Sequence, residues 1–225
     1  MYPDTARSES AHVVRSLALH LVLRLGSLQR KPTHLLHSID GYACPAKWWR
    51  RFRVYYLHMR KIIVIAHDIR STHNVGALLR TAECLGVAKL YFTGYTPYPE
   101  AGNDARLPHI SKKLTQQIHK TALGTELTQP WEHYDDPLKC IAQLKADGYT
   151  VYALEQTAGS VELPTWSPPD KLALLIGREV EGIDDALLKV CDVHLEIPQF
   201  GTKESLNVVE ATSMALYQAR FAPFA

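Results

Sequence analysis

The chain has 225 residues, of which 46% are hydrophobic and 21% charged, and its formal net charge is +2. This composition is ordinary for a soluble globular protein, and the length allows one domain of good size or one domain with an extension. The four cysteines lie far apart and form no CxxC pair, which argues against a zinc site or a disulfide framework. We therefore expect a reducing, cytoplasmic location and no bound metal.

The charge is distributed unevenly along the chain. Residues 1–58 carry 9 Lys or Arg against 3 Asp or Glu, whereas residues 59–225 carry 16 against 20. The apolar run at about residues 13–28 contains two arginines, a histidine and a glycine, so it is too short and too charged for a membrane span. No small-residue cleavage pattern follows it, so it is not a good signal peptide either. We expect a protein that does not span a membrane.

A second feature of the N-terminal part is the segment KWWRRFR at residues 47–53, which mixes stacking rings with cations and could contact nucleic acid. The alternatives are a poorly ordered tail and a segment that is not translated in the native protein. Met59 stands immediately before the first clear strand, so a start there would leave a complete domain. We expect an N-terminal extension at residues 1–58 and one domain at residues 59–225.

Hydrophobic periodicity predicts alternating strands and helices in that domain. Apolar runs predict strands at residues 61–66, 89–93, 149–154, 171–176 and 193–197. Apolar residues at helical spacing predict helices at residues 75–85, 110–121, 137–147, 184–190 and 206–220. The alternation is typical of an α/β fold with a mostly parallel sheet and helices on both faces. The stretch at residues 94–108 contains Pro and Gly and is a long loop, of the kind that often binds ligands.

The last predicted helix carries polar residues at its start. Ser205 is placed as its N-cap, and the helix is apolar on nearly all sides, which is typical of a buried core helix. A core role does not account for Asn207, which brings a second hydrogen-bonding side chain to the same helix mouth. A ligand site at this position is the alternative to plain packing.

Three short motifs follow predicted strands in a fixed order. The first is Asn74-Val75-Gly76 with Arg80, the second is GREVEG at residues 177–182, and the third joins IPQFG at residues 197–201 to SLNV at residues 205–208. Together they resemble the three motifs of the SpoU (TrmH-like) family in the SPOUT superfamily of RNA methyltransferases. The resemblance covers about residues 61–221. Gln199 and Glu210 depart from it, because the family commonly has apolar or small residues at these positions.

The resemblance implies a SPOUT-type fold with a C-terminal trefoil knot, and a homodimer with the site near the subunit interface. It also implies transfer of a methyl group from S-adenosylmethionine to a ribose 2'-hydroxyl of RNA. Open parallel sheets bind ligands beyond the carboxyl ends of their strands, and all three motifs fall there. The family match places cofactor-binding residues at Leu154, Glu155, Gly177, Gly182, Ile197, Ser205 and Leu206.

Glycine at positions 177 and 182 would let the backbone approach this cofactor closely. A plain tight turn is the alternative interpretation of GREVEG. No GxGxxG follows the first predicted strand, so the sequence lacks the ordinary Rossmann-type cofactor loop.

The resemblance also implies a catalytic set, which comprises Arg80, Asn74, Glu179, Ser205 and Asn207. Arg80 lies off the apolar stripe of its helix, and the alternative for it is a solvated arginine paired with an acid. Because guanidinium groups stay protonated near pH 7, we expect Arg80 to clamp a phosphate and stabilise developing alkoxide charge rather than to act as the base. Arg70 and His73 border the site and are weaker candidates for phosphate contact.

The other members of the catalytic set are amide, hydroxyl and carboxyl groups. Asn74 is expected to cap the helix of the first motif and to orient Arg80 or the ribose. Glu179 is expected to hold Asn74, Arg80 or the nucleotide, with a plain surface glutamate as the alternative. By family match, Ser205 and Asn207 form hydrogen bonds with substrate and cofactor.

The choice of RNA depends on a less specific resemblance. YTVYALEQTAGSVEL at residues 149–163 and the following LLIGREVEGI look most like the enzymes that methylate a guanosine in the tRNA D-loop. The alternatives are a ribosomal RNA or tRNA wobble-position enzyme, a non-catalytic RNA-binding protein of the same fold, and an α/β nucleotide-binding protein unrelated to RNA.

Overall fold

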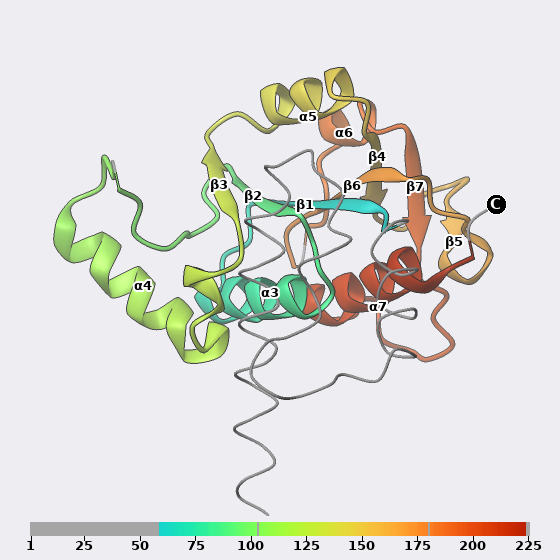
Figure 1. The fold of residues 1–225 in the computed structure, drawn as a ribbon. Coiled ribbons are helices and arrows are strands. Elements are labelled where there is room, and N and C mark those ends of the chain that lie inside the picture. Colours follow the sequence, from blue (N-terminus) through green and yellow to red (C-terminus); the bar gives the residue numbers. More distant parts are fainter. Residues whose placement is uncertain (1–58, 103, 180, 224–225) are drawn as a thin grey trace, which may run out of the picture. The chain divides into compact units, whose positions relative to one another are not determined.

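The computed structural model describes residues 59–102, 104–179 and 181–223, so the expectation for residues 1–58 lies outside the described residues. The described part contains one seven-stranded sheet (Figure 1). Its strands are β1 (Lys61–His67), β2 (Lys89–Thr93), β3 (Trp131–Tyr134), β4 (Thr150–Leu154), β5 (Val161–Glu162), β6 (Lys171–Ile176) and β7 (Val193–Glu196). Their order is β3-β2-β1-β6-β4-β7-β5, and every neighbouring pair is parallel, which confirms the predicted parallel α/β sheet.

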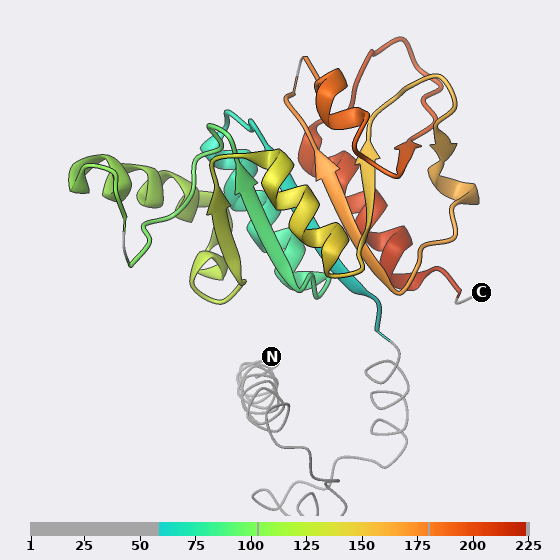
Figure 2. The same ribbon diagram turned by 90° about the horizontal axis from the view of Figure 1, so that it is seen from above.

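Helices cover both faces of this sheet. They are α3 (Thr72–Cys84), α4 (Pro108–Ala122), α5 (Pro137–Ala146), α6 (Asp185–Leu188) and α7 (Val208–Phe221), with single 3-10 turns η1 (Thr125–Leu127) and η2 (Leu163–Thr165). Helices α3 and α7 lie on one face, and α5 and α6 lie on the other (Figures 1 and 2). The predicted covering of both faces is confirmed.

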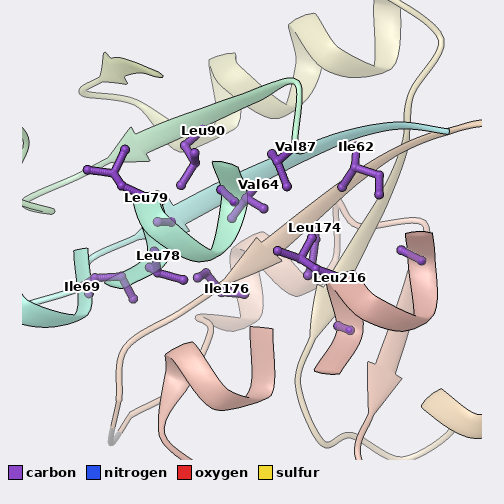
Figure 3. Close-up of a cluster of buried hydrophobic side chains, with 14 of the residues drawn as sticks. Ile62, Val64, Ile69, Leu78, Leu79, Val87, Leu90, Leu174, Ile176 and Leu216 are labelled. Carbon is purple, nitrogen blue, oxygen red and sulfur yellow. The ribbon is translucent and has the colours of Figure 1, made fainter. Parts of the chain in front are cut away.

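The alternation of side chains along β1 divides the core into two clusters. Ile62 and Val64 face α3 and α7, where they join Leu78 and Leu216 (Figure 3). Ile63 and its alternate neighbours join the residues of α5 and α6 on the other face. Six of the seven residues of β1 are buried, which explains why its sequence is a continuous apolar run. Each such side chain contributes about 1.5–3 kcal/mol when it is fully buried.

Two strands were not predicted from the sequence. β3 has only four residues and lies at the edge of the sheet, where it pairs with β2 alone. β5 has two residues and lies at the opposite edge, paired with β7. Neither is long enough to show the periodicity by which strands are recognised.

Both predicted helix starts at the motifs need correction. The N-cap of α7 is Asn207, whose side chain accepts a hydrogen bond of 2.8 Å from the backbone N–H of Val209, so the prediction of Ser205 as the cap is wrong. The N-cap of α3 is Ser71, so the prediction that Asn74 caps this helix is also wrong. In each case several residues in a row can serve as caps, and only the fold selects one of them.

The strand order brings the loops of the motifs together. β6 lies between β1 and β4, and β7 lies between β4 and β5 although it follows both in the sequence. Since all strands are parallel, the loops that leave β1, β4, β6 and β7 emerge at one edge of the sheet. The trefoil knot implied by the resemblance stays a prediction. Among the described residues, no helix is long and apolar enough to cross a membrane.

The end of α7 is fastened to the start of the domain by two arginines. The guanidinium of Arg60, which is 3% exposed, donates to the carbonyl oxygens of Pro168 at 3.0 Å and of Ala222 and Pro223 at 2.7 Å. Arg220 donates in turn to the carbonyl of Arg60 at 2.9 Å. Cationic donors satisfy carbonyl groups that a helix C-terminus leaves without partners. Burial lowers the pKa of Arg60 from its usual value.

Candidate active site

One hydrogen-bonded chain of side chains joins the three motifs. The Asn74 amide nitrogen donates to Oε1 of Glu179 at 3.0 Å, and the Asn207 amide nitrogen donates to Oδ1 of Asn74 at 3.5 Å. Asn74 lies in the first turn of α3, Glu179 in the loop after β6, and Asn207 at the start of α7. The fold therefore assembles Glu179, Asn74 and Asn207 from segments that are far apart in the sequence.

The position of Asn74 follows from the capping of its helix. Ser71 accepts a hydrogen bond from the backbone N–H of Asn74 at 3.3 Å, so this N–H needs no other partner. The carboxamide of Asn74 is then available for Glu179. Glu179 was expected to hold Asn74, Arg80 or the nucleotide, and in the structure it contacts Asn74.

Ser205 is not part of this hydrogen-bonded chain. It is exposed, and its hydroxyl makes no hydrogen bond within the described residues. It precedes the capping residue Asn207 by two positions, so it lies at the mouth of α7 as expected, but outside the helix. Its role as a hydrogen-bonding group for substrate or cofactor stays a prediction.

Arg80 lies on another side of α3. It follows Asn74 by six residues, which places the two side chains about 240° apart around the helix axis. It is exposed and lines a groove of about 530 Å³ between α3 and α4, together with Thr81, Lys120 and Leu123. Within one copy of the described chain, Arg80 makes no hydrogen bond or ion pair with Glu179, Asn74 or Asn207.

The second motif forms a tight turn that is fixed by Glu155. The backbones of Arg178 and Gly182 exchange two hydrogen bonds of 3.2 Å. Gly182 has a φ of +70°, and a Cβ atom there would lie 2.4 Å from Oε2 of Glu155. The same carboxylate oxygen accepts a hydrogen bond of 3.0 Å from the backbone N–H of Ile183. Glycine is thus needed at 182 for a contact within the chain, whereas the sequence suggested contact with a cofactor.

Gly177 is restricted in the same way. A Cβ atom at this position would lie 2.6 Å from Cγ1 of Ile183 and 2.7 Å from the carbonyl oxygen of Gly182. The two glycines therefore allow the loop after β6 to fold back upon itself. This is the tight turn that the sequence left open as an alternative, and it brings Glu155, from the loop after β4, against the second motif.

The remaining candidates for cofactor binding lie at the carboxyl ends of neighbouring strands. Leu154 pairs with Leu195 in the ladder between β4 and β7, and the backbone N–H of Glu155 donates to the carbonyl of Leu195 at 2.9 Å. Leu154, Ile197 and Leu206 are half-buried, and the first two pack against the core. These residues offer apolar surface and backbone groups, which suit an adenosine without a phosphate. The residues present therefore fit S-adenosylmethionine.

Electrostatic contacts tie the loop after β1 to its neighbours. Arg70 forms an ion pair of 2.9 Å with Glu181 of the second motif. His67 is buried, its Nδ1 lies 3.0 Å from the hydroxyl of Thr93, and its Nε2 lies 3.3 Å from a carboxylate oxygen of Asp68. Burial lowers the pKa of His67, so the imidazole is neutral at pH 7. His67 belongs to none of the three sequence motifs.

No group of three His, Cys, Asp or Glu residues that could hold a metal ion occurs among the described residues. Cys140 and Cys191 are free thiols, and burial raises the pKa of each to about 12, so neither is a reactive thiolate.

The three motifs and the sheet lie within a segment that matches a known protein family. The sequence profile of the SpoU rRNA Methylase family matches residues 61–217. The chain belongs to this SpoU family. The resemblance stated from the three motifs is confirmed.

The names of two SpoU relatives give different RNAs as their substrates. The chain is 28% identical over 161 residues to a tRNA (guanosine(18)-2'-O)-methyltransferase of Aquifex aeolicus, covering 72% of this chain and 69% of the relative. It is 29% identical over 159 residues to a 23S rRNA (guanosine-2'-O-)-methyltransferase of Neisseria meningitidis, and this match covers 71% of this chain and 58% of the relative.

Solved structures share the SpoU fold. An AdoMet-bound rRNA methyltransferase from Sinorhizobium meliloti superposes with a TM-score of 0.61 at 24% identity, covering 74% of this chain and 58% of that one. The chain thus spans somewhat more than half the length of this protein and of the Neisseria relative.

Proposed function

We propose that this SpoU protein transfers a methyl group from S-adenosylmethionine to a ribose 2'-hydroxyl of RNA. The observation that carries the proposal is the hydrogen-bonded chain Glu179–Asn74–Asn207, which unites the three motifs at the carboxyl edge of the sheet. Family membership and the activities named for the Aquifex and Neisseria relatives support it.

The cofactor supplies an electrophilic methyl group on a positively charged sulfur. The half-buried side chains of Leu154, Ile197 and Leu206 provide apolar walls for its adenosine and exclude water from the reacting atoms. Glu155 and Gly182 hold the second motif in position beside these walls.

The amides are oriented to bind the ribose. Because the carboxylate of Glu179 can only accept hydrogen bonds, it fixes the nitrogen of Asn74 towards itself and the oxygen of Asn74 towards Asn207. The Asn207 nitrogen has a second N–H, which is available to donate to a ribose oxygen. Orientation of this kind lowers the barrier because little ordering remains for the reaction step.

Arg80 clamps the phosphate next to the reacting ribose and stabilises the developing alkoxide. A charged guanidinium offers parallel N–H donors that match phosphate oxygens. Since Arg80 points away from Asn74 on the same helix, we assign it to the site of a second subunit in a homodimer.

An exposed apolar stripe on α7 supports the homodimer. Met214, Tyr217 and Phe221 recur at helical spacing and are 46%, 62% and 54% exposed. Helix α7 packs against α3, so a subunit bound along this stripe would approach α3 as well. Tyr217→Asp places a charge in the stripe, and sedimentation equilibrium should then find a monomer. A variant that stays dimeric would refute this interface.

The proposed substrate is a guanosine of tRNA, in the D-loop. The stretch at residues 149–163 and the Aquifex relative favour tRNA, whereas the Neisseria relative favours ribosomal RNA. Methyl transfer from labelled S-adenosylmethionine to unmodified tRNA and rRNA transcripts separates the two, with nuclease mapping of the product.

The control in this assay is Lys139→Ala, which removes an exposed cation on α5 that belongs to none of the three motifs. We expect label at one tRNA guanosine with the wild type and with Lys139→Ala, and almost none with Arg80→Ala. Label in rRNA alone would reassign the substrate. Cofactor binding without label in any RNA would favour a non-catalytic RNA-binding protein.

A further inference from the structure

A depression of about 780 Å³ lies beside the motif loops and has no role in the site described above. It is enclosed by the loop between β1 and α3, the loop that follows β2, and α4. No Asp or Glu occurs among its lining residues in the described part of the chain. Its lining combines cationic, aromatic and amide side chains, among them Arg70, His73, Tyr95, Tyr98, Gln117 and His133.

One wall of this depression is a fixed stack. The rings of Tyr98 and His133 are stacked with centroids 4.2 Å apart, and the guanidinium of Arg106 lies 3.6 Å from the centroid of the Tyr98 ring. Arg106 donates to the carbonyls of Tyr98 and Pro99 at 2.9 Å and pairs with Asp104, so these contacts within the chain hold its guanidinium in place. The wall is therefore preformed and does not need a ligand to order it.

Other lining groups remain available to a ligand. The side chain of Tyr95 is exposed, and its residue as a whole is 52% exposed. The side chain of Arg70 is 63% exposed, and its pair with Glu181 is a surface ion pair that a phosphate can replace at little cost. The side chains of His73 and Gln117 make no hydrogen bond within the described residues.

These groups match the chemistry of a nucleotide. Exposed aromatic rings stack with bases of any sequence, and arginines pair with phosphate oxygens. A carboxamide can both donate to and accept from a base edge. The formal charge of residues 59–225 is negative, and the lining of the depression carries arginines without an Asp or Glu of its own, although Glu181 and Asp104 pair with these arginines from outside the lining. RNA phosphates can therefore approach the domain at Arg70 by replacing its exposed partner.

The depression adjoins the proposed reaction site. His73 is the residue before Asn74, and Arg70 contacts Glu181, which lies two positions after Glu179 in the second motif. We propose that the depression binds the nucleotide next to the methylated one in an unpaired stretch of RNA. Its base stacks on Tyr95, its phosphate pairs with Arg70, and its base edge bonds to Gln117. This inference rests on the proposed function, because it takes the substrate to be RNA.

The test uses the full chain and two substitutions of one residue. Tyr95→Ala removes the ring, whereas Tyr95→Phe keeps the ring and loses only the 3.4 Å contact from Arg70 to the hydroxyl. For a fluorescent single-stranded RNA and for tRNA transcript, we expect Tyr95→Ala to raise Kd and KM about tenfold. Tyr95→Phe should stay within about threefold of the wild type. Calorimetry should find cofactor binding unchanged in both, which also shows that they fold.

Arg70→Ala tests the phosphate contact, with Lys139→Ala as the control of equal charge change. Arg70→Ala should weaken RNA binding and reduce the salt slope of log Kd by about one, while Lys139→Ala should change neither. The inference is overturned if Tyr95→Ala binds RNA like the wild type, or if Tyr95→Phe loses as much affinity as Tyr95→Ala. Methyl transfer by the wild type is measured separately. Failure of the proposed nucleotide site and failure of the proposed reaction therefore give different results.

Discussion

The carboxamide of Asn74 donates a hydrogen bond of 3.0 Å to the carboxylate of Glu179, which lies 105 residues further along the chain. This contact connects the first turn of α3 to the loop after β6. It leaves the oxygen of Asn74 for Asn207, at the start of α7. We therefore expect Glu179 to act through Asn74 as a positioning residue, by accepting this hydrogen bond rather than by its negative charge.

Substitution of Glu179 separates these two properties. Glu179→Gln keeps an oxygen that can accept from Asn74, so kcat should stay within about tenfold of the wild type. Glu179→Ala leaves the amide unheld, and kcat should fall about 100-fold because the reacting groups lose their orientation. Single-turnover methyl transfer measures both, with cofactor binding as the control. Equal losses in the two variants would show that the charge itself is required.

Arg80 is exposed and makes no contact that supports the fold in the described residues, so its substitution should affect the reaction and not stability. Arg80→Ala should lower kcat by about 100- to 1,000-fold. Arg80→Lys should lower it nearly as much, because an ammonium group lacks the planar pair of donors. Thermal melting should be unchanged for both. Near-normal turnover by Arg80→Lys with bound RNA would contradict the phosphate clamp.

The contact between Gly182 and Glu155 predicts a large effect of one methyl group. Gly182→Ala combines a positive φ with an overlap of Cβ and the carboxylate, and should cost about 2–3 kcal/mol of unfolding free energy and weaken cofactor binding. Gly159→Ala is a matched control, because Gly159 has a φ of +93° and no atom within 4 Å of the added Cβ. It should cost about 1 kcal/mol. Urea denaturation measures both, and equal losses would show that the Glu155 contact is unimportant.

The hydrogen bonds of Arg60 predict a large effect of its substitution on the free energy of unfolding. Arg60→Ala removes hydrogen bonds to four carbonyl groups, those of Pro168, Ala219, Ala222 and Pro223, and the unfolding free energy should fall by about 2–4 kcal/mol. Arg60→Lys should recover little of this loss, because an ammonium group cannot reach all of these oxygens at once. Lys61→Ala changes the adjacent exposed residue and should stay within about 0.5 kcal/mol of the wild type. If Arg60→Ala also lowered the unfolding free energy by no more than about 0.5 kcal/mol, the hydrogen bonds of Arg60 would not stabilise α7.

The sequence predicted the central part of the fold because burial is strongest there. β6 and β2 have the bounds that their apolar runs predicted, since strands buried on both faces need apolar residues throughout. β3 and β5 were missed because short edge strands have little hydrophobic pattern. The capping residues were misassigned, because Ser71 and Asn74, or Ser205 and Asn207, are equally suitable caps on local grounds.

The sequence predicted which residues form the candidate site, but it did not predict the contacts among their side chains. The three motifs identified Glu179, Asn74 and Asn207, but no sequence rule indicates that their side chains bond to one another. The internal role of Glu155 was hidden because it depends on the close approach of two loops. The wall of Tyr98 and His133 was missed for the same reason, since its residues come from separate segments.

The position of the transferred methyl group distinguishes methylation of a ribose from methylation of a base. A tRNA transcript is methylated with labelled S-adenosylmethionine and then hydrolysed completely in alkali, which cleaves only where a free 2'-hydroxyl is present. If the enzyme methylates the ribose of one guanosine, the label remains in one alkali-stable dinucleotide that begins with guanosine. Label released in mononucleotides would place the methyl group on a base and would contradict ribose methylation.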